Sequence, residues 1–404
     1  MLIASLYFFL NKRVFDYYTI AFFGCFLYFM PGFFGMTSYL NESGWVKTPI
    51  HELTYLLMII VIFSILMFGW IADKLFKTKV NFKRIFVIEY KVHYSLLFLA
   101  LVSSLSLILL IISTNGMVFQ AEKDSVLESL NRWHILFYSA ATLGFPIAAF
   151  FRKIKLSIVF FTLLVVNLYI GFRAPIVISV LALLVVFLSA KGPIRLIVYY
   201  KWLLTFTCFG LLMFLYKYIA FGIKAGLWDL VFQSITNAET YVNMITMSEP
   251  FVVLNNLNIV IIKNYTTGFD HLMSAVYQLI LFAPQLGAET VSFNDHFQND
   301  LFPTVKYGLA SNIWAQMLSS GGWLLCVFFV AFYNIALFLG RYFLYRFNLL
   351  TICITSPIFV YFAFYIHRND LGYAINISKR LFLIIIAVKI FITMLDSTKK
   401  VQNN

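Results

Sequence analysis

Charged residues are scarce in this chain of 404 residues: they make up 12% of it, whereas apolar residues make up 62%. A soluble protein of this size carries about 25% charged residues. The strict alternation that membrane β-strands need is absent, and the apolar runs are continuous. Repeated runs of about 20 apolar residues predict helices that span a membrane. We therefore expect an all-α polytopic membrane protein.

Several motifs of well-known chemistry are also missing. The four cysteines stand singly in or beside apolar runs and form no CxxC pair, so neither a zinc site nor a redox motif is supported. No P-loop, GxGxxG, HExxH or GxSxG occurs, which leaves ATPases, nucleotide-sugar enzymes, zinc proteases and serine hydrolases without a supporting motif. We expect no metal and no cofactor.

Ten apolar runs are suited to span the membrane. They lie near residues 17–34, 53–72, 94–113, 134–151, 156–170, 175–190, 202–220, 321–340, 349–367 and 381–395. The N-terminal MLIASLYFFL is shorter, because ten helical residues rise only about 15 Å. We interpret it as an interfacial or partly inserted segment, which would bring the number of membrane helices to eleven if it spans.

The charges fall into two alternating sets of loops. One set carries 18 of the 30 basic residues and 4 of the 17 acidic ones, and the other carries 10 basic and 13 acidic residues. Lysine and arginine accumulate in short cytoplasmic loops. The pattern predicts a plasma-membrane protein with both termini in the cytoplasm. The net charge of +13 is thus a sign of topology and not of nucleic-acid binding.

This topology divides the chain into three parts. We expect a first bundle of about seven spans over 1–220, a large outer loop over 221–320 and about three spans over 321–404. Within the loop, 271–286 has helical spacing and ends at Pro284. It is either a lid on the membrane surface or a helix packed inside the loop.

Arg173 lies in the outer turn GFRA, between two short apolar runs. Short spans would place this turn slightly below the outer surface, where a partly desolvated guanidinium binds a phosphate through two hydrogen bonds. The alternative is an interfacial arginine whose head reaches lipid headgroups.

A second basic group, in YIHRNDLGYAINISKRLFL, departs from the trend that places positive charge inside. Arg368, Lys379 and Arg380 are predicted to lie outside and close to the membrane. They are candidates to bind the phosphates of a lipid-linked substrate. In the alternative, Arg368 pairs with Asp370 while the other two meet lipid phosphates. Outer arginines together with a large acidic loop suit a glycan carried on a polyprenyl diphosphate.

Three stretches resemble segments of the Wzy-type O-antigen and oligosaccharide repeat-unit polymerases. YIGFRAPIVISVLALLVVF is similar to that family's outer turn with an arginine, and FYIHRNDLGYAINISKRLFLIII to its last outer loop. YGLASNIWAQMLSSGGWLLCVFFVAFYNIALFLGRYF is similar to the segment that leaves the large loop. The resemblance covers most of the chain. It implies a multi-span, metal-independent glycosyltransferase of the bacterial inner membrane.

The implied reaction transfers a growing glycan from undecaprenyl diphosphate to a sugar hydroxyl of an incoming undecaprenyl-diphosphate-linked repeat unit. Arg173 and Arg368 are then candidates to neutralise the leaving diphosphate, with Lys379 and Arg380 beside them. Membrane lipids and a chain-length regulator are the further partners implied. The alternatives are an O-antigen ligase, and a flippase or other transporter.

The acceptor hydroxyl needs a base. Our first candidates are Glu239, Asp270, His296 and His367, because histidine titrates near neutral pH and acids gather in the loop. In the alternative to a catalytic role, Asp270 is only the N-cap of a helix, and the acids belong to a loop that is simply exposed to solvent. Further acids and histidines of the outer loop qualify as well: Glu249, His271, Glu289 and Asp295. Tyr307 and Trp314 are candidates to stack on sugars, or else belong to an aromatic belt.

Overall fold

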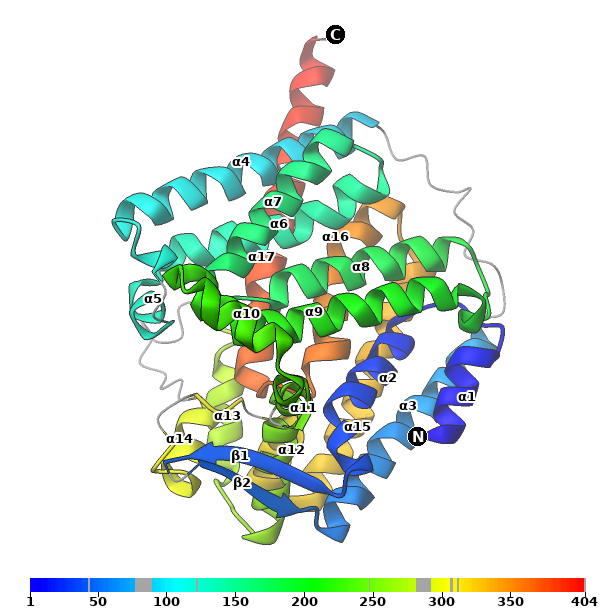
Figure 1. Ribbon diagram of the computed structural model, residues 1–404. Coiled ribbons are helices and arrows are strands. Elements are labelled where there is room, and N and C mark those ends of the chain that lie inside the picture. Colours follow the sequence, from blue (N-terminus) through cyan, green and yellow to red (C-terminus); the bar gives the residue numbers. More distant parts are fainter. Residues whose placement is uncertain are drawn as a thin grey trace.

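The computed structural model describes residues 1–42, 44–76, 89–120, 123–246, 248–280, 292–305, 308–310 and 312–402. Over these residues the chain is helical apart from one short hairpin of strands (Figure 1). The predicted all-α class therefore describes the architecture, and the hairpin is an addition to it.

The apolar runs predicted as spans are helices. Four described helices are long and apolar enough to cross a membrane: α3 (Glu52–Leu75), α4 (Glu89–Ser113), α6 (Arg132–Phe150) and α15 (Ile313–Arg346). Four more predicted spans coincide with shorter apolar helices: α2 (Tyr17–Tyr28), α7 (Ile154–Ile170), α8 (Ala174–Ala190) and α16 (Leu349–Tyr365). The last two fall in longer helices: α9 (Tyr200–Ala225) and α17 (Leu371–Gln402). The apolar helices indicate a membrane protein, and the number of ten spans stays a prediction.

Polar side chains fix where several of these helices begin. The backbone N–H of Thr351 donates to the side chain of Asn348 at the start of α16, over 2.9 Å, and Asn131 caps α6 in the same way. Such caps satisfy N–H groups that have no partner inside the helix. The helices therefore start at polar residues and run through the apolar stretches that follow.

A buried network of charges ties the N-terminal segment to two distant helices. Arg13 follows α1 (Leu2–Leu10) and donates to Asp16 at 3.1 Å and Asp73 at 2.9 Å. Arg341 of α15 donates to the same two aspartates, each at 2.6 Å. The side chains of Asp16 and Arg341 are fully buried. Burying four charges is tolerable only because they are mutually paired.

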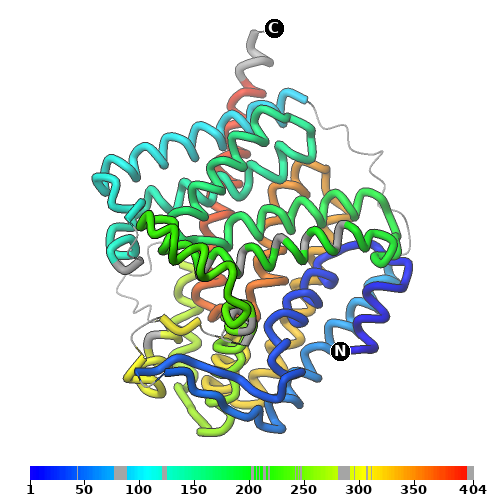
Figure 2. The backbone as a smooth tube through the Cα atoms, in the orientation of Figure 1, coloured from blue at the N-terminus to red at the C-terminus, as the bar shows by residue number. Residues whose placement is uncertain are grey.

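The helices form two groups. α4, α6, α7 and α8 pack against one another, whereas α1, α2, α3 and α15 form the second group (Figure 1). α16 contacts α6 and α8 of the first group and α2 and α15 of the second, and the path of the chain through both is plain in Figure 2. α16 therefore places residues of the two groups next to each other.

The segment predicted as a large outer loop is itself helical. It contains α10 (Trp228–Thr236), α11 (Ala238–Thr246), α12 (Glu249–Ile262), α13 (Phe269–Tyr277) and α14 (Phe293–Leu301). α12 packs against α2, α3 and α15, and nearly all of its side chains are buried. α12 is thus a core element of the second helix group.

The hairpin consists of β1 (Met36–Asn41) and β2 (Gly44–Pro49), paired antiparallel. The hydroxyl of Thr37 donates to the side-chain oxygen of Asn255 on α12 over 2.9 Å. The backbone N–H of His51, just after the hairpin, donates to Asn258 over 2.8 Å. The hairpin was not predicted, although residues of alternating exposure run along β2. Its contacts fasten α12 to the start of α3.

Two helices of the loop differ from their predicted bounds. α13 begins at Phe269 and ends at Tyr277, and Pro284 lies outside the described residues. α13 packs on α15 and α17, which are helices of the predicted spans. α15 begins at Ile313, eight residues before the predicted span, and breaks at Gly321 and Gly322. Gly322 has a φ of 65°, a conformation that favours glycine.

Candidate functional site

Arg173 is held in place by the turn that contains it. Gly171, with a φ of 128°, ends α7, and α8 begins at Ala174 with a proline in its first turn. The side chain of Asn167, on the last turn of α7, donates to the Phe172 carbonyl over 2.9 Å. His134 contacts the Asn167 side-chain oxygen at 2.9 Å, and both polar side chains are buried. These hydrogen bonds therefore fix the backbone of the turn from which the Arg173 side chain extends.

Arg368 lies in the turn between α16 and α17. The backbone N–H groups of Arg368 and Asn369 donate to the Tyr365 carbonyl at 3.0 and 3.1 Å. The side chain of Asn369 accepts from Arg368 Nη1 at 3.1 Å and donates to the Tyr361 hydroxyl at 2.7 Å. The guanidinium is thus oriented by its own turn.

Glu249 brings the two arginines together. It stands in the first turn of α12, where a carboxylate interacts favourably with the helix dipole. Arg173 Nη2 donates to Glu249 Oε2 over 3.3 Å, and Arg368 Nε donates to Oε1. The side chains of Arg173, Arg368 and Glu249 are 24, 28 and 17% exposed. We call these three residues the arginine cluster, and they meet at a half-buried position that solvent still reaches.

Tyrosine rings surround the cluster. Tyr28 and Tyr365 lie within electrostatic reach of all three of its members. The rings of Tyr361 and Tyr365 stack with centroids 5.5 Å apart. Tyr373, in the first turn of α17, interacts with Arg368 and 45% of its surface is exposed. The cluster thus combines positive charge with an aromatic wall.

The other two predicted cations lie on α17. Arg380 Nη1 contacts the Tyr138 hydroxyl at 3.5 Å, and Tyr373 interacts with both Arg380 and Arg368. Arg380 therefore extends the positive surface from the arginine cluster. Lys379 instead donates to the backbone carbonyl of Gln278, after α13. Its contact links α17 to the loop and not to the cluster.

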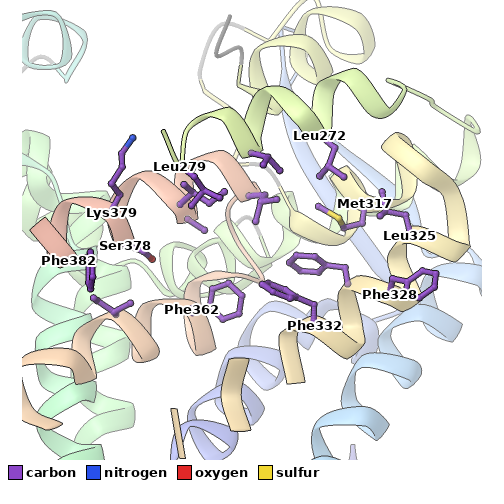
Figure 3. Close-up of a pocket in the computed structure, with 16 residues that line it drawn as sticks. Leu272, Leu279, Met317, Leu325, Phe328, Phe332, Phe362, Ser378, Lys379 and Phe382 are labelled. Carbon is purple, nitrogen blue, oxygen red and sulfur yellow. The ribbon is translucent and has the colours of Figure 1, made fainter. Parts of the chain in front are cut away.

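Lys379 borders an apolar pocket of about 710 Å³ (Figure 3). Leu272 of α13 and Phe332 of α15 line it together with Phe362 of α16 and Phe382 of α17. Phe362 faces this pocket, whereas its neighbour Tyr361 binds Asn369 on the side of the arginine cluster. α16 and α17 therefore line the pocket and also flank the turn that carries Arg368 of the cluster.

His367, predicted as a base, is fully buried among aromatic side chains. Trp314 Nε1 donates to His367 Nδ1 over 3.2 Å, and the Tyr333 hydroxyl lies 3.3 Å from Nε2. Cys25 Sγ lies 3.4 Å from Nε2. Both ring nitrogens thus have partners inside the protein. His367 and Trp314 pack α15, α16 and α2 together, where neither faces the cluster.

The remaining predicted bases are at the surface. Glu239 stands in the first turn of α11 and Asp270 in that of α13, and both are exposed. Gly268, not Asp270, is the N-cap of α13. His296 on α14 is also exposed, and its ring packs edge-on against His271, with centroids 4.0 Å apart. None of these three residues is among the contacts of the arginine cluster.

Burial lowers the pKa of His271, and the neighbouring His296 ring lowers it further, while Asp300 opposes them. The hydroxyl of Tyr265 donates to Asp300 over 2.6 Å, and burial together with this carboxylate raises the pKa of Tyr265. His271 therefore favours its neutral form, and the contact of its ring with that of His296 links α13 to α14.

One predicted alternative has a definite outcome, whereas two predicted residues have none. Asp370 does not pair with Arg368: it accepts the backbone N–H of Tyr373 over 2.7 Å at the start of α17, and a hydrogen bond from Ser292 over 3.1 Å. The alternative in which Arg368 is neutralised by Asp370 is therefore wrong. Tyr307 and Glu289 lie outside the described residues.

The sequence contained only a weak signal for the partners of the arginines. Glu249 was one of eight acids and histidines with no feature to rank it, apart from the Ser-Glu-Pro start of a helix. Asn167 lies inside an apolar run, where a buried amide signals an internal hydrogen bond. The sequence does not name the partners of Asn167, which the structure shows to be His134 and the Phe172 carbonyl.

Comparison of the chain with protein-family models, with curated protein sequences and with solved structures yields no match. The geometry of the arginine cluster and the pattern of the sequence are consequently the basis for assigning a function.

Proposed function

We propose that this protein is a metal-independent membrane glycosyltransferase that polymerises lipid-linked oligosaccharide repeat units. It transfers the growing glycan from undecaprenyl diphosphate to a sugar hydroxyl of an incoming lipid-linked repeat unit, at the outer face of the bacterial plasma membrane. The observation that carries the proposal is the convergence of Arg173 and Arg368, from two separate turns, on one half-buried position.

Two guanidinium groups at one position suit a diphosphate. Each guanidinium has a planar set of donors that matches two phosphate oxygens. Partial burial strengthens their attraction for the negative charge that develops as the diphosphate leaves. Arg380 adds a third positive charge on the same side of α17 as Tyr373.

Surfaces suited to the sugar and to the hydrocarbon chain of the substrate lie near the cluster. The exposed ring of Tyr373 offers an aromatic face to a sugar. The pocket lined by Phe332 and Phe362 is apolar, which suits a hydrocarbon chain, and two of its helices, α16 and α17, flank the turn of Arg368. The ten-span topology with cytoplasmic termini that the sequence predicts would put the turns of Arg173 and Arg368 on the same, outer side.

The direct test is elongation by the purified protein in lipid nanodiscs, with a synthetic undecaprenyl-diphosphate-linked repeat unit as donor and acceptor. We expect products of two and more repeats, separated on a gel and weighed by mass spectrometry. A failure to elongate any lipid-linked repeat overturns the proposal. Transfer only to a lipid A core acceptor would make the protein a ligase, and transport without bond formation would make it a flippase.

A further inference from the structure

Glu249 occupies the position that a phosphate would have to take. Its two carboxylate oxygens accept hydrogen bonds from Arg173 and Arg368. Those same donors are the ones that the proposed function assigns to the diphosphate. An incoming anion must therefore compete with this carboxylate for both guanidinium groups.

The carboxylate of Glu249 also stabilises the empty site. Two guanidinium groups brought together in a half-buried place repel each other, and an intervening carboxylate compensates for this. The rings of Tyr28 and Tyr365, both buried and both interacting with the three charges, restrict solvent there. Glu249 thus keeps the arginines oriented while no substrate is bound.

The position of Glu249 allows it to leave without unfolding its helix. It stands in the first turn of α12, with Ser248 as N-cap and Pro250 next to it, whereas the rest of α12 is packed in the core. Rotation of its side chain alone would separate the carboxylate from the arginines. The displaced group would remain next to the cluster.

We propose that Glu249 is an internal counter-ion that the donor diphosphate displaces, and that the displaced carboxylate then acts as the base for the acceptor hydroxyl. This inference rests on the proposed function. It assigns the role of base to Glu249, which the sequence alone gave no reason to prefer among the eight candidate acids and histidines. It also makes the base available only when the donor is bound, so that water is not activated in the empty site.

The proposed step forms one bond at the anomeric carbon and breaks another. The acceptor hydroxyl oxygen forms a bond to the anomeric carbon of the donor glycan. The bond from that carbon to the diphosphate oxygen breaks, and its electron pair leaves with undecaprenyl diphosphate, whose charge Arg173 and Arg368 bind. The hydroxyl proton passes to the carboxylate of Glu249, which later returns it to water.

The experiment compares Glu249→Gln with the wild type in two measurements on the full-length protein in nanodiscs. The first is the affinity for inorganic pyrophosphate, measured by calorimetry. Loss of the internal anion should tighten this affinity by roughly tenfold. The second is the elongation rate, which should fall by about 100-fold or more because the base is lost.

Opposite changes in affinity and rate separate this role from a structural one, which would lower both. Asp229→Asn, an exposed acid on α10, is the matched control and should change neither quantity. Glu249→Asp keeps the charge and should retain pyrophosphate affinity within about threefold of the wild type, even if Glu249→Gln folds poorly.

The two measurements on Glu249→Gln test the counter-ion and the base separately. Unchanged or weaker pyrophosphate binding by Glu249→Gln overturns the counter-ion, and a normal elongation rate overturns the base. Pyrophosphate binding needs no turnover, so the counter-ion is tested even if the wild type does not polymerise. In that case the proposed function is overturned, and the pyrophosphate affinities still decide whether Glu249 is a counter-ion.

Discussion

Arg173 and Arg368 bind opposite oxygens of one carboxylate, that of Glu249. Arg173 lies between α7 and α8 and Arg368 lies between α16 and α17, whereas Glu249 is the first residue of α12. The contact of α16 with α8 brings the two turns together. Three parts of the chain that are far apart in sequence thus form one anion-binding position.

The arginines should be indispensable for elongation. We expect Arg173→Ala and Arg368→Ala each to reduce the rate by about 100- to 1000-fold, since each removes a donor to the developing charge. Lysine at either position should restore little, because an ammonium cannot replace two parallel hydrogen bonds.

The measurement is the length of glycan made by equal amounts of folded protein. Arg152→Ala is the control, because Arg152 is an exposed arginine in the turn between α6 and α7. Full-length product with either cluster variant would remove that arginine from the site.

The turn that carries Arg173 should depend on Asn167. Asn167→Ala leaves the Phe172 carbonyl and the His134 ring without their partner, which should cost about 1–3 kcal/mol of stability. Thermal unfolding of the purified protein measures this change. His134→Ala combined with Asn167→Ala should cost less than the sum of the two single changes. Strict additivity would show that the two side chains are not coupled.

The buried charge network should matter for folding and not for chemistry. Arg341→Ala leaves Asp16 and Asp73 short of a partner, which should cost about 3–5 kcal/mol. Arg346→Ala, an exposed arginine on the same helix, should cost less than about 0.5 kcal/mol. The yield of folded protein and its melting temperature report the difference. A stable Arg341→Ala variant that has lost elongation would contradict the assignment.

The His271–His296 pair should make the contact of α13 with α14 sensitive to acid. The pKa of His271 is lowered in the folded protein, so the unfolded chain binds its proton first as the pH falls below about 6.5. Stability is therefore lost from that pH downward, until the lowered pKa is reached, by at most about 1.4 kcal/mol per pH unit.

Replacing His271 with glutamine should reduce this loss. The measurement is the melting temperature between pH 7 and pH 5, with the wild type beside the variant. Identical pH profiles for the two proteins would show that the proton uptake occurs elsewhere.

The orientation in the membrane can be tested with reporter fusions. A reporter joined at residue 237, between α10 and α11, should be active outside the cytoplasm, and one joined at residue 152 should be active inside. The reverse result would place the arginine cluster in the cytoplasm and would overturn the proposed reaction.

Much of the helix content was predictable from the sequence. The continuous apolar runs gave the positions of α3, α4, α6, α7, α8 and α16 to within a few residues, because local hydropathy decides which segments avoid water. The hairpin was missed, since strands this short are held by contacts with α12 that no local pattern contains. α12 itself is apolar, yet it lies in a segment with many acids, and its burial was not foreseen.

The sequence by itself determined that apolar helices dominate the chain and that two arginines stand in turns where such charges are costly. Hydropathy and charge are local properties, and each can be read from a few neighbouring residues. Only the tertiary structure decided which groups those arginines meet, because α12, which carries Glu249, packs on α2 and α15, both of which contact α16, and α16 in turn packs on α8. The same packing enclosed His367 and left His296 exposed, although both looked alike in the sequence.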